Sequence, residues 1–154
     1  MEFDAAATEG AVVSKLINRC QFTIEWGHCD PSGIVFNSRV FEFFDWGTWA
    51  LFETALGVKR QDLSGAFDII GVPLVDANAR FHAPVRFGDV VELSSQVGVF
   101  RRSSFDVEHR LAVRGTLVVE GIETRVWAER SAVDPSQIKA RPIPDQVIAR
   151  FQAL

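Results

Sequence analysis

Hydrophobic and polar side chains alternate along several segments of the chain, and this alternation predicts β-strands. In residues 20–26 the apolar side chains of Phe22, Ile24 and Trp26 occupy one phase, while polar side chains occupy the other. A period of two is the pattern of a strand that buries one of its faces. Further segments with strand character lie at residues 68–82, 89–100, 104–113 and 116–129.

Residues 38–56 are dense in aromatic side chains and predict one long helix, because the segment is too long for a typical strand. Asn37 or Ser38 can cap its start, and Gly57 can end it. Apolar residues go nearly all the way round, so we expect this helix to be surrounded by protein. A second, short helix is expected over roughly residues 145–153.

The order of these segments predicts an α+β fold. One strand precedes the long helix, and a run of antiparallel strands follows it. A single sheet of about five strands must then curl around the helix to cover its apolar surface. The strand at 68–82 contains Pro73, with Pro84 close by, so we expect it to be bulged or to lie at an edge. Such a sheet cannot cover both the helix and its own outer face, and we therefore expect oligomers.

The length of 154 residues suits one domain, so we interpret residues 1–154 as a single unit with one core. Residues 1–14 predict a mobile lead-in, and residues 134–154 a C-terminal tail. A net charge of −4 does not favour nucleic acid, and no apolar run approaches the roughly 20 residues that span a membrane. The first residues do not resemble a secretory signal, and two cysteines make no disulfide scaffold, so we expect a cytoplasmic protein.

The densest group of chemically active residues follows the first strand, in the turn Asp30-Pro31-Ser32-Gly33. Pro31 restricts the backbone after Asp30, and Gly33 permits close approach by another group. The backbone amides at the start of the long helix, near Asn37, are free donors with a partial positive charge. They can hold a developing oxyanion while Asp30 attacks a carbonyl or activates water. The same residues also suit a purely structural turn that caps the helix.

Four segments of the chain, in order and with similar spacing, resemble hotdog-fold acyl-CoA thioesterases of the 4-hydroxybenzoyl-CoA thioesterase type. The resemblance covers roughly residues 20–130 and includes the family's Asp-x-Asp-Pro-x-Gly-Ile-Val signature, with His28 in place of the first aspartate. It implies a hotdog fold, a curved antiparallel sheet of about five strands wrapped around one long central helix. The segments are residues 28–35 (His-Cys-Asp-Pro-Ser-Gly-Ile-Val), 44–46 (Phe-Asp-Trp), 70–75 (Ile-Gly-Val-Pro-Leu-Val) and 100–105 (Phe-Arg-Arg-Ser-Ser-Phe).

The resemblance implies roles for particular residues. Asp30 is expected to act as nucleophile or general base, and the backbone amide of Asn37 to polarise the thioester carbonyl. Asp45, an acid on a mostly apolar helix, is expected in the acyl pocket, although its own chemistry equally suits pairing with another side chain. The basic hairpin is expected to bind coenzyme A phosphates. The implied substrate contacts are Gly33, Phe36, Asp45, Arg101, Arg102 and Ser103.

Other catalytic chemistries find little support in the sequence. His28 and Cys29 flank Asp30, but neighbours in sequence rarely face each other as a nucleophile and its base must. The three histidines do not have metal-ligand spacing, so no metal and no cofactor are expected. His109 falls on the apolar phase of its strand, which favours a histidine satisfied in the core or in an interface.

The sequence therefore predicts an acyl-CoA thioesterase that releases a free acid and coenzyme A, with an aromatic acyl group of the 4-hydroxybenzoyl kind. Two alternatives remain, a thioesterase for short aliphatic acyl-CoA and a non-catalytic hotdog protein that binds acyl-CoA. Asp30 argues against the second, because a binding protein has no use for a carboxylate aimed at a thioester. The resemblance further implies a homo-oligomer, dimer or tetramer, with pockets between its subunits.

Overall fold

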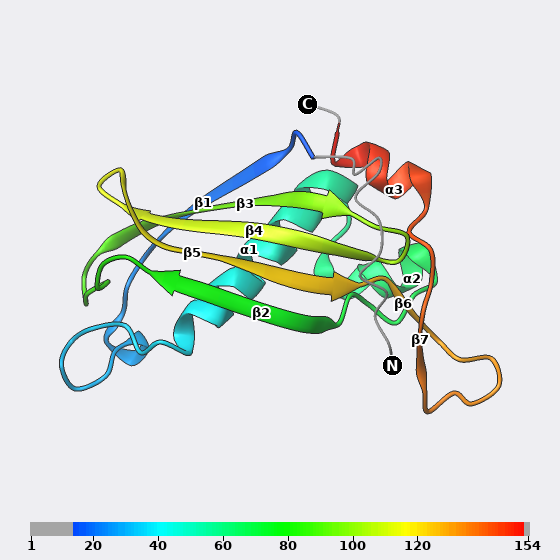
Figure 1. Ribbon diagram of the computed structural model, residues 1–154, viewed down its shortest axis with the longest axis horizontal. Helices are drawn as coiled ribbons and strands as arrows, with labels where there is room; N and C mark the ends of the chain where they lie inside the picture. The colour runs from blue at the N-terminus through cyan, green and yellow to red at the C-terminus, as the bar shows by residue number, and fades with distance from the viewer. Residues whose placement is uncertain (1–13, 153–154) are drawn as a thin grey trace.

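The computed structural model describes residues 14–152, in which a five-stranded antiparallel sheet curves across one long helix (Figure 1). The strand order in the sheet is β1–β3–β4–β5–β2. The predicted α+β architecture, a curved antiparallel sheet of five strands around one long helix, is thereby confirmed. The elements are β1 (Ile17–Thr23), η1 (Trp26–His28), α1 (Arg39–Leu56), η2 (Arg60–Asp62), α2 (Leu63–Phe67), β2 (Leu74–Phe81), β3 (Val90–Phe100), β4 (Ser104–Val113), β5 (Thr116–Val126), β6 (Ala128–Arg130), β7 (Ile138–Ala140) and α3 (Asp145–Arg150).

The central helix α1 begins and ends close to the predicted residues. Ser38 is its N-cap residue, and Gly57 ends it in a left-handed conformation with φ of 66°, which glycine adopts without strain. The side of α1 that faces the sheet is buried, but Trp46 on the other side is 44% exposed. The expectation of a helix surrounded by protein therefore holds, within this chain, only for its sheet-facing side.

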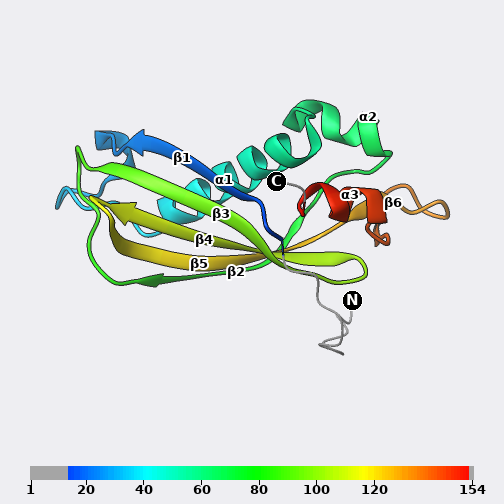
Figure 2. The same ribbon diagram turned by 90° about the horizontal axis from the view of Figure 1, so that it is seen from above.

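The sheet buries one face against α1, as Figure 2 shows. Strand β3 alternates between buried and more exposed residues along most of its length, and β4 does the same. Because paired residues of antiparallel strands share a face, the register fixes which side chains meet the helix. Among residues 14–152, no helix covers the opposite face.

Strand β2 is both bulged and at the edge of the sheet, as its prolines suggested. Its pairing with β5 shifts register between Leu74 and Asp76. Leu74 and Phe81 are 47% and 50% exposed, and β5 is the one strand that pairs with β2 within the described residues. This edge is open to a further strand.

Three predicted boundaries were wrong for identifiable reasons. The first strand ends at Thr23, and Trp26 lies in the one-turn helix η1 with 61% of its surface exposed instead of pointing inward. The strand predicted over residues 68–82 begins only at Leu74, because residues 68–73 form the loop between α2 and β2. The strand predicted to reach residue 129 ends at Val126, and the chain then forms a separate two-stranded sheet, β6–β7.

Two glycines allow α1 to approach the sheet closely. A Cβ atom at Gly47 would collide with Ser95 Oγ, and one at Gly121 with the ring of Phe44. The buried polar residues under α1 fit only because these positions carry no side chain. At the N-terminus, the predicted lead-in over 1–14 lies outside the described residues except for Ser14, which is buried and donates a hydrogen bond to the Phe151 carbonyl.

Candidate active site

Asp30 lies at the tip of a short hairpin that connects β1 to α1. Its carbonyl accepts a hydrogen bond from Gly33 N–H at 3.0 Å, and its own N–H donates to the Ile34 carbonyl at 2.9 Å. Gly33 has a φ of 79°, a left-handed conformation in which a side chain would be strained. The turn residues recognised in the sequence thus fix the backbone of Asp30.

Ser32 supplies the hydrogen bonds that stabilise the Asp30 carboxylate. Its hydroxyl and its backbone N–H, the latter at 2.8 Å, both donate to Asp30 Oδ1. These bonds, the hydroxyl first, lower the pKa of Asp30, so the side chain is an anion at neutral pH. Within residues 14–152, no protein group donates to Asp30 Oδ2. One carboxylate oxygen is therefore free to act on a ligand.

The backbone amides just before α1 are available donors. Within the described residues, the N–H groups of Asn37 and Ser38 reach no protein acceptor. Asn37 is three residues beyond Ile34, the backbone partner of Asp30, so one short segment carries both the carboxylate and the free amide. A carboxylate and an amide of this kind can act on the carbon and on the oxygen of one bound carbonyl.

A cavity of about 400 Å³ lies beside Asn37. Its walls come from the Asp30 hairpin, the start of α1 and the segment after β2, and they are mainly apolar. Phe36, another predicted contact, is 51% exposed near this cavity. One free amide at an apolar cavity suits the thioester end of an acyl chain. The lining includes Ile34, Val35, Asn37, Val40, Phe81 and Val85.

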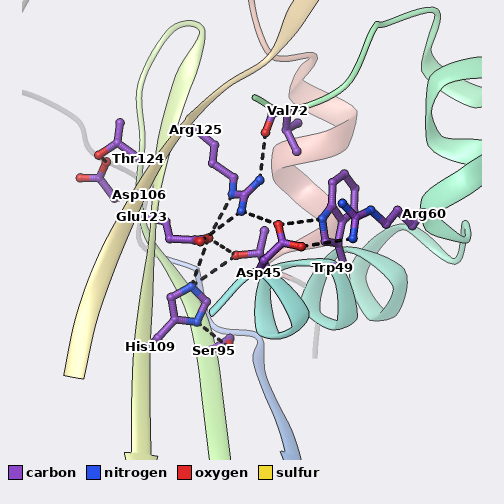
Figure 3. A network of polar contacts seen from close by, with 11 residues as sticks. Asp45, Trp49, Arg60, Val72, Ser95, Asp106, His109, Glu123, Thr124 and Arg125 are labelled. Carbon is purple, nitrogen blue, oxygen red and sulfur yellow. Dashed lines mark hydrogen bonds and ion pairs between the residues drawn. The ribbon is translucent and has the colours of Figure 1, made fainter. Parts of the chain in front are cut away.

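Asp45 on α1 is held by three side chains, which surround its carboxylate in Figure 3. Its Oδ1 accepts hydrogen bonds from Trp49 Nε1 at 3.1 Å and Arg125 Nη2 at 2.8 Å. Its Oδ2 accepts one from Arg60 Nη1 at 3.1 Å. Trp49, Arg60 and Arg125 also line a second cavity, of about 380 Å³. Asp45 is therefore a paired acid, and its partners lie at a cavity.

Behind Asp45, a buried polar network runs into the core (Figure 3). Arg125 Nε donates to Glu123 Oε2 at 3.0 Å, and Thr48 Oγ1 donates to the same oxygen at 2.6 Å. His109 Nε2 lies 3.4 Å from that oxygen. Burial alone would raise the pKa of Glu123, but the hydrogen bonds from His109, Arg125 and Thr48 lower it to about 2. Glu123 is therefore the permanent anion that balances Arg125.

The histidine of this network is structural. Burial lowers the pKa of His109, so its ring is neutral at pH 7, and Ser95 Oγ lies 2.8 Å from its Nδ1. Ser95, His109 and Glu123 contact one another in the sequence serine, histidine, acid, as in a serine-type catalytic triad. Each is only 1% exposed, however, so no substrate can reach them. The prediction of a core histidine with satisfied nitrogens is confirmed.

The predicted coenzyme A contacts lie at the far end of the sheet from Asp30 (Figure 1). Arg101 donates to both carboxylate oxygens of Asp106, at 2.9 and 2.6 Å. Arg102 is exposed, and its guanidinium has no partner among residues 14–152. Ser103 follows it in the turn between β3 and β4. Because β3 separates the hairpin from Asp30 by roughly 30 Å, one chain does not bring these residues together.

His28 and Cys29 do not form a nucleophile–base pair. His28 Nδ1 accepts a hydrogen bond from Glu25 N–H at 3.0 Å, and its ring packs edge-on against Phe43 and Trp46. Cys29 Sγ points to the Glu25 carbonyl, 3.7 Å away. The histidine that replaces the family's first aspartate thus stabilises the one-turn helix η1.

Sequence reasoning missed Arg60, Glu123 and Arg125. A signal existed for the last two, because they share a strand phase with Val119, which is fully buried, and an acid and a base on such a phase indicate a buried pair. Nothing in the sequence pointed to Arg60. Across residues 14–152 there is no His, Cys, Asp and Glu cluster fit for a metal, and no helix long and apolar enough to cross a membrane.

Comparisons with known proteins agree with this arrangement. The profile of the thioesterase-like superfamily matches residues 24–151. The 4-hydroxybenzoyl-CoA thioesterase of Pseudomonas sp. (strain CBS-3) is 30% identical over 135 residues, which are 83% of this chain and 92% of that protein.

Solved structures show the same architecture. The structure of the 4-hydroxybenzoyl-CoA thioesterase from that Pseudomonas strain aligns with a TM-score of 0.77 at 26% identity, covering 87% of this chain and 98% of the other. A gentisyl-coenzyme A thioesterase aligns with a TM-score of 0.73 at 30% identity, covering 85% and 99%. Similarity in sequence and in fold therefore extends over most of the chain.

Proposed function

The chain belongs to the thioesterase-like superfamily and is an acyl-CoA thioester hydrolase, and we propose that its substrates carry a hydroxylated aromatic acyl group. The observation that carries this proposal is Asp45, a fixed carboxylate whose partners line a cavity on the helix that begins beside the free Asn37 amide. Asp45 is eight residues beyond Asn37, or roughly 12 Å along the helix. A 4-hydroxybenzoyl group, as in the Pseudomonas relative, suits that span.

In the proposed reaction, the Asn37 amide binds the thioester oxygen and the free oxygen of Asp30 acts at the carbonyl carbon. Asp30 either attacks this carbon itself or takes a proton from the water that does. In both routes the carbon–sulfur bond breaks, coenzyme A leaves as the thiolate, and water supplies the second oxygen of the acid. The support is an anionic Asp30 that keeps one oxygen unoccupied, and a helix-start amide that has no acceptor, both within the part of the chain that the structure describes.

The two alternatives are less well supported. A short aliphatic acyl group has no hydrogen-bond donor for Asp45. The ordered Asp45 carboxylate would then contribute nothing to substrate binding. A non-catalytic acyl-CoA-binding protein has no need for the free oxygen of Asp30.

We further propose a homo-oligomer, dimer or tetramer, that pairs β2 with its own copy. The exposed edge and apolar side chains of β2 support this pairing. In a twofold dimer of this kind, the hairpin end of one sheet lies beside the Asp30 end of the other. Arg101, Arg102 and Ser103 of a second subunit would then reach the coenzyme A bound at Asp30. The proposal includes a cytoplasmic location, where the free thiols of Cys20 and Cys29 stay reduced.

A panel of acyl-CoA substrates, with release of free thiol as the readout, tests the proposed substrate class. We expect 4-hydroxybenzoyl-CoA to exceed benzoyl-CoA and short aliphatic acyl-CoA in kcat/KM. Asp45→Ala should reduce the preference for the hydroxylated over the plain ring by about 10- to 100-fold, because the ring hydroxyl loses its acceptor. A wild-type preference for aliphatic chains would refute the aromatic assignment. An unchanged ranking in Asp45→Ala would make Asp45 purely structural.

A further inference from the structure

Arg60 binds the Asp45 carboxylate and also lines the cavity of about 380 Å³. Its guanidinium carbon lies 4.4 Å from the ring centre of Trp49, and its Nη1 lies 3.1 Å from Asp45 Oδ2. Its backbone N–H donates to Glu53 Oε1 at 3.1 Å, which ties the start of η2 to α1. The Arg60 side chain is 56% exposed. Arg60 is thus positioned by three contacts and still accessible from outside.

The hydrogen bonds of Asp45 leave one direction of approach for a ligand. Oδ1 already accepts from Trp49 and from Arg125, which fills both of its lone pairs. Oδ2 accepts only from Arg60 among the described residues, so one lone pair remains there. A hydroxyl that donates to Oδ2 must approach the oxygen next to the Arg60 guanidinium. Among residues 14–152, Asp45 is also the one acceptor of the hydrogen bonds of that guanidinium, which therefore keeps free N–H groups.

The charges around this oxygen favour a neutral ligand. Asp45 and Glu123 are the acids of the network, and Arg60 and Arg125 are its bases, so the four charges cancel. A hydroxyl adds no charge and can both donate and accept. A carboxylate substituent would bring an uncompensated negative charge next to Asp45, and a plain ring would leave the polar groups without a partner.

We propose that Arg60 is a specificity-determining residue that shares the ring hydroxyl of the acyl group with Asp45. The hydroxyl donates to Asp45 Oδ2 and accepts from the Arg60 guanidinium, while Trp49 holds that guanidinium in place. This inference rests on the proposed hydrolysis of hydroxylated aromatic acyl-CoA. It adds that an arginine from the segment after α1 recognises the substituent, and that phenols are preferred to both unsubstituted and carboxylated rings.

Arg60→Met tests the inference, because methionine keeps an apolar stem over Trp49 and removes the N–H donors. We expect kcat/KM for 4-hydroxybenzoyl-CoA to fall by about 10- to 100-fold and that for benzoyl-CoA to change by less than about 3-fold. Wild type should process 4-carboxybenzoyl-CoA worse than either. Arg39→Met is the matched control: Arg39 also pairs with a carboxylate on α1, Glu42, but lines neither cavity. Its substrate ranking should match wild type.

Three results would overturn the role of Arg60. Arg60→Met could lose kcat/KM equally on both substrates, it could gain kcat/KM for 4-hydroxybenzoyl-CoA, or wild type could prefer the carboxylated ring. The non-hydrolysable ketones 4-hydroxyphenacyl-CoA and phenacyl-CoA separate this role from catalysis. In calorimetry, Arg60→Met should weaken the binding of 4-hydroxyphenacyl-CoA about 10-fold and leave the binding of phenacyl-CoA unchanged. If wild type hydrolyses no aromatic acyl-CoA, the proposed function fails, and the binding ratio alone still decides the role of Arg60.

Discussion

Asp30 and Asp45 are both acids at the candidate site, but their surroundings differ in one respect. The Asp30 carboxylate receives its hydrogen bonds on a single oxygen, from Ser32 of its own turn, and the other oxygen is free among residues 14–152. Asp45 receives hydrogen bonds on both oxygens, from residues far apart in the chain. A free oxygen can attack or take a proton. A carboxylate that is held at both oxygens and keeps one lone pair on Oδ2 can only orient what it binds.

The difference shows how one fold separates chemistry from recognition. The Asp30 turn is built from local sequence, so its geometry needs few other parts of the protein. The Asp45 site needs α1, η2 and β5 together, and an ion-pair network that fills the core behind it. The function of the Asp30 turn should therefore be sensitive to a change in charge alone. The function of the Asp45 site should be sensitive to changes in any of several distant residues.

The largest effect is expected from Asp30→Asn. The substitution keeps the shape of the turn and the hydrogen bonds of Ser32, but it removes the negative charge. We expect kcat to fall by at least about 10²- to 10⁴-fold, since a lost base costs that much and a lost nucleophile usually more. Since the pKa of Asp30 is lowered, wild-type activity should fall only in the acid range, as the carboxylate is protonated. That acid limb should be missing from the residual rate of the mutant.

Two controls accompany the kinetics of Asp30→Asn, the melting temperature and the binding of 4-hydroxyphenacyl-CoA. Both should stay near the wild-type values. A folded mutant with near wild-type kcat would exclude Asp30 from the chemistry. Asp30 and Asp45 would then differ only in how exposed their carboxylates are. An unfolded mutant would instead support the structural reading of the turn.

A smaller effect is expected from Arg102→Ala, which removes the hairpin guanidinium that has no partner among the described residues. KM should rise by about 3- to 10-fold with little change in kcat, because a phosphate contact binds substrate and transition state alike. Arg101→Ala should have a weaker effect, since Arg101 is already paired with Asp106. Neither change should affect an acyl-pantetheine substrate, which lacks the nucleotide phosphates. Equal losses on both substrates would exclude phosphate binding.

Mixing the two variants tests whether the hairpin acts on the site of another subunit. If each site combines Asp30 of one subunit with Arg102 of the other, a mixed dimer of Asp30→Asn and Arg102→Ala has two different sites. One site lacks both wild-type residues, and the other has both. After unfolding and refolding together, about a quarter of all sites should recover the wild-type KM. If each chain uses its own hairpin, no site recovers. Sedimentation of the mixture shows whether dimers form, and a monomer would contradict the shared site.

The regular elements of the fold followed from the sequence to within a few residues. Alternation located β4, general strand character located β3 and β5, and aromatic density with flanking caps located α1. The helix α2 was missed because it is only five residues long, and a helix of that length is stabilised by its packing rather than by its own sequence. Trp26 was misplaced because the periodicity continued past the point where the chain turns.

The candidate site was predictable where it is local. Asp30, Gly33 and Asn37 lie in one motif, and their arrangement follows from a turn and a helix start. The partners of Asp45 could not be predicted, because Arg60 and Arg125 reach it across 15 and 80 positions of sequence. Side-chain pairing over such separations depends on the register between elements, which a single sequence does not specify.

The smallest effect is expected on stability, from the histidine behind Asp45. Burial lowers the pKa of His109 below its ordinary value of 6.5. The unfolded chain then binds more protons than the folded one as the pH drops below about 6.5, so folding stability falls in that direction. Glu123 acts in a lower window: its pKa of about 2, against 4.5, gives stability that is present above pH 4.5 and lost below it. Acid should therefore destabilise the protein in two steps.

His109→Gln separates these steps. A glutamine can still accept from Ser95 and donate to Glu123, but it does not titrate. We expect a lower melting temperature than wild type at pH 8, because the amide fills the site less well than the ring. Between pH 6.5 and pH 5 the melting temperature of the mutant should vary less than that of wild type. His82→Gln, which removes an exposed histidine paired with Glu120, is the control and should retain the wild-type slope. If His109→Gln keeps the wild-type slope, His109 does not titrate with folding, and the neutral histidine assigned to the network behind Asp45 is wrong.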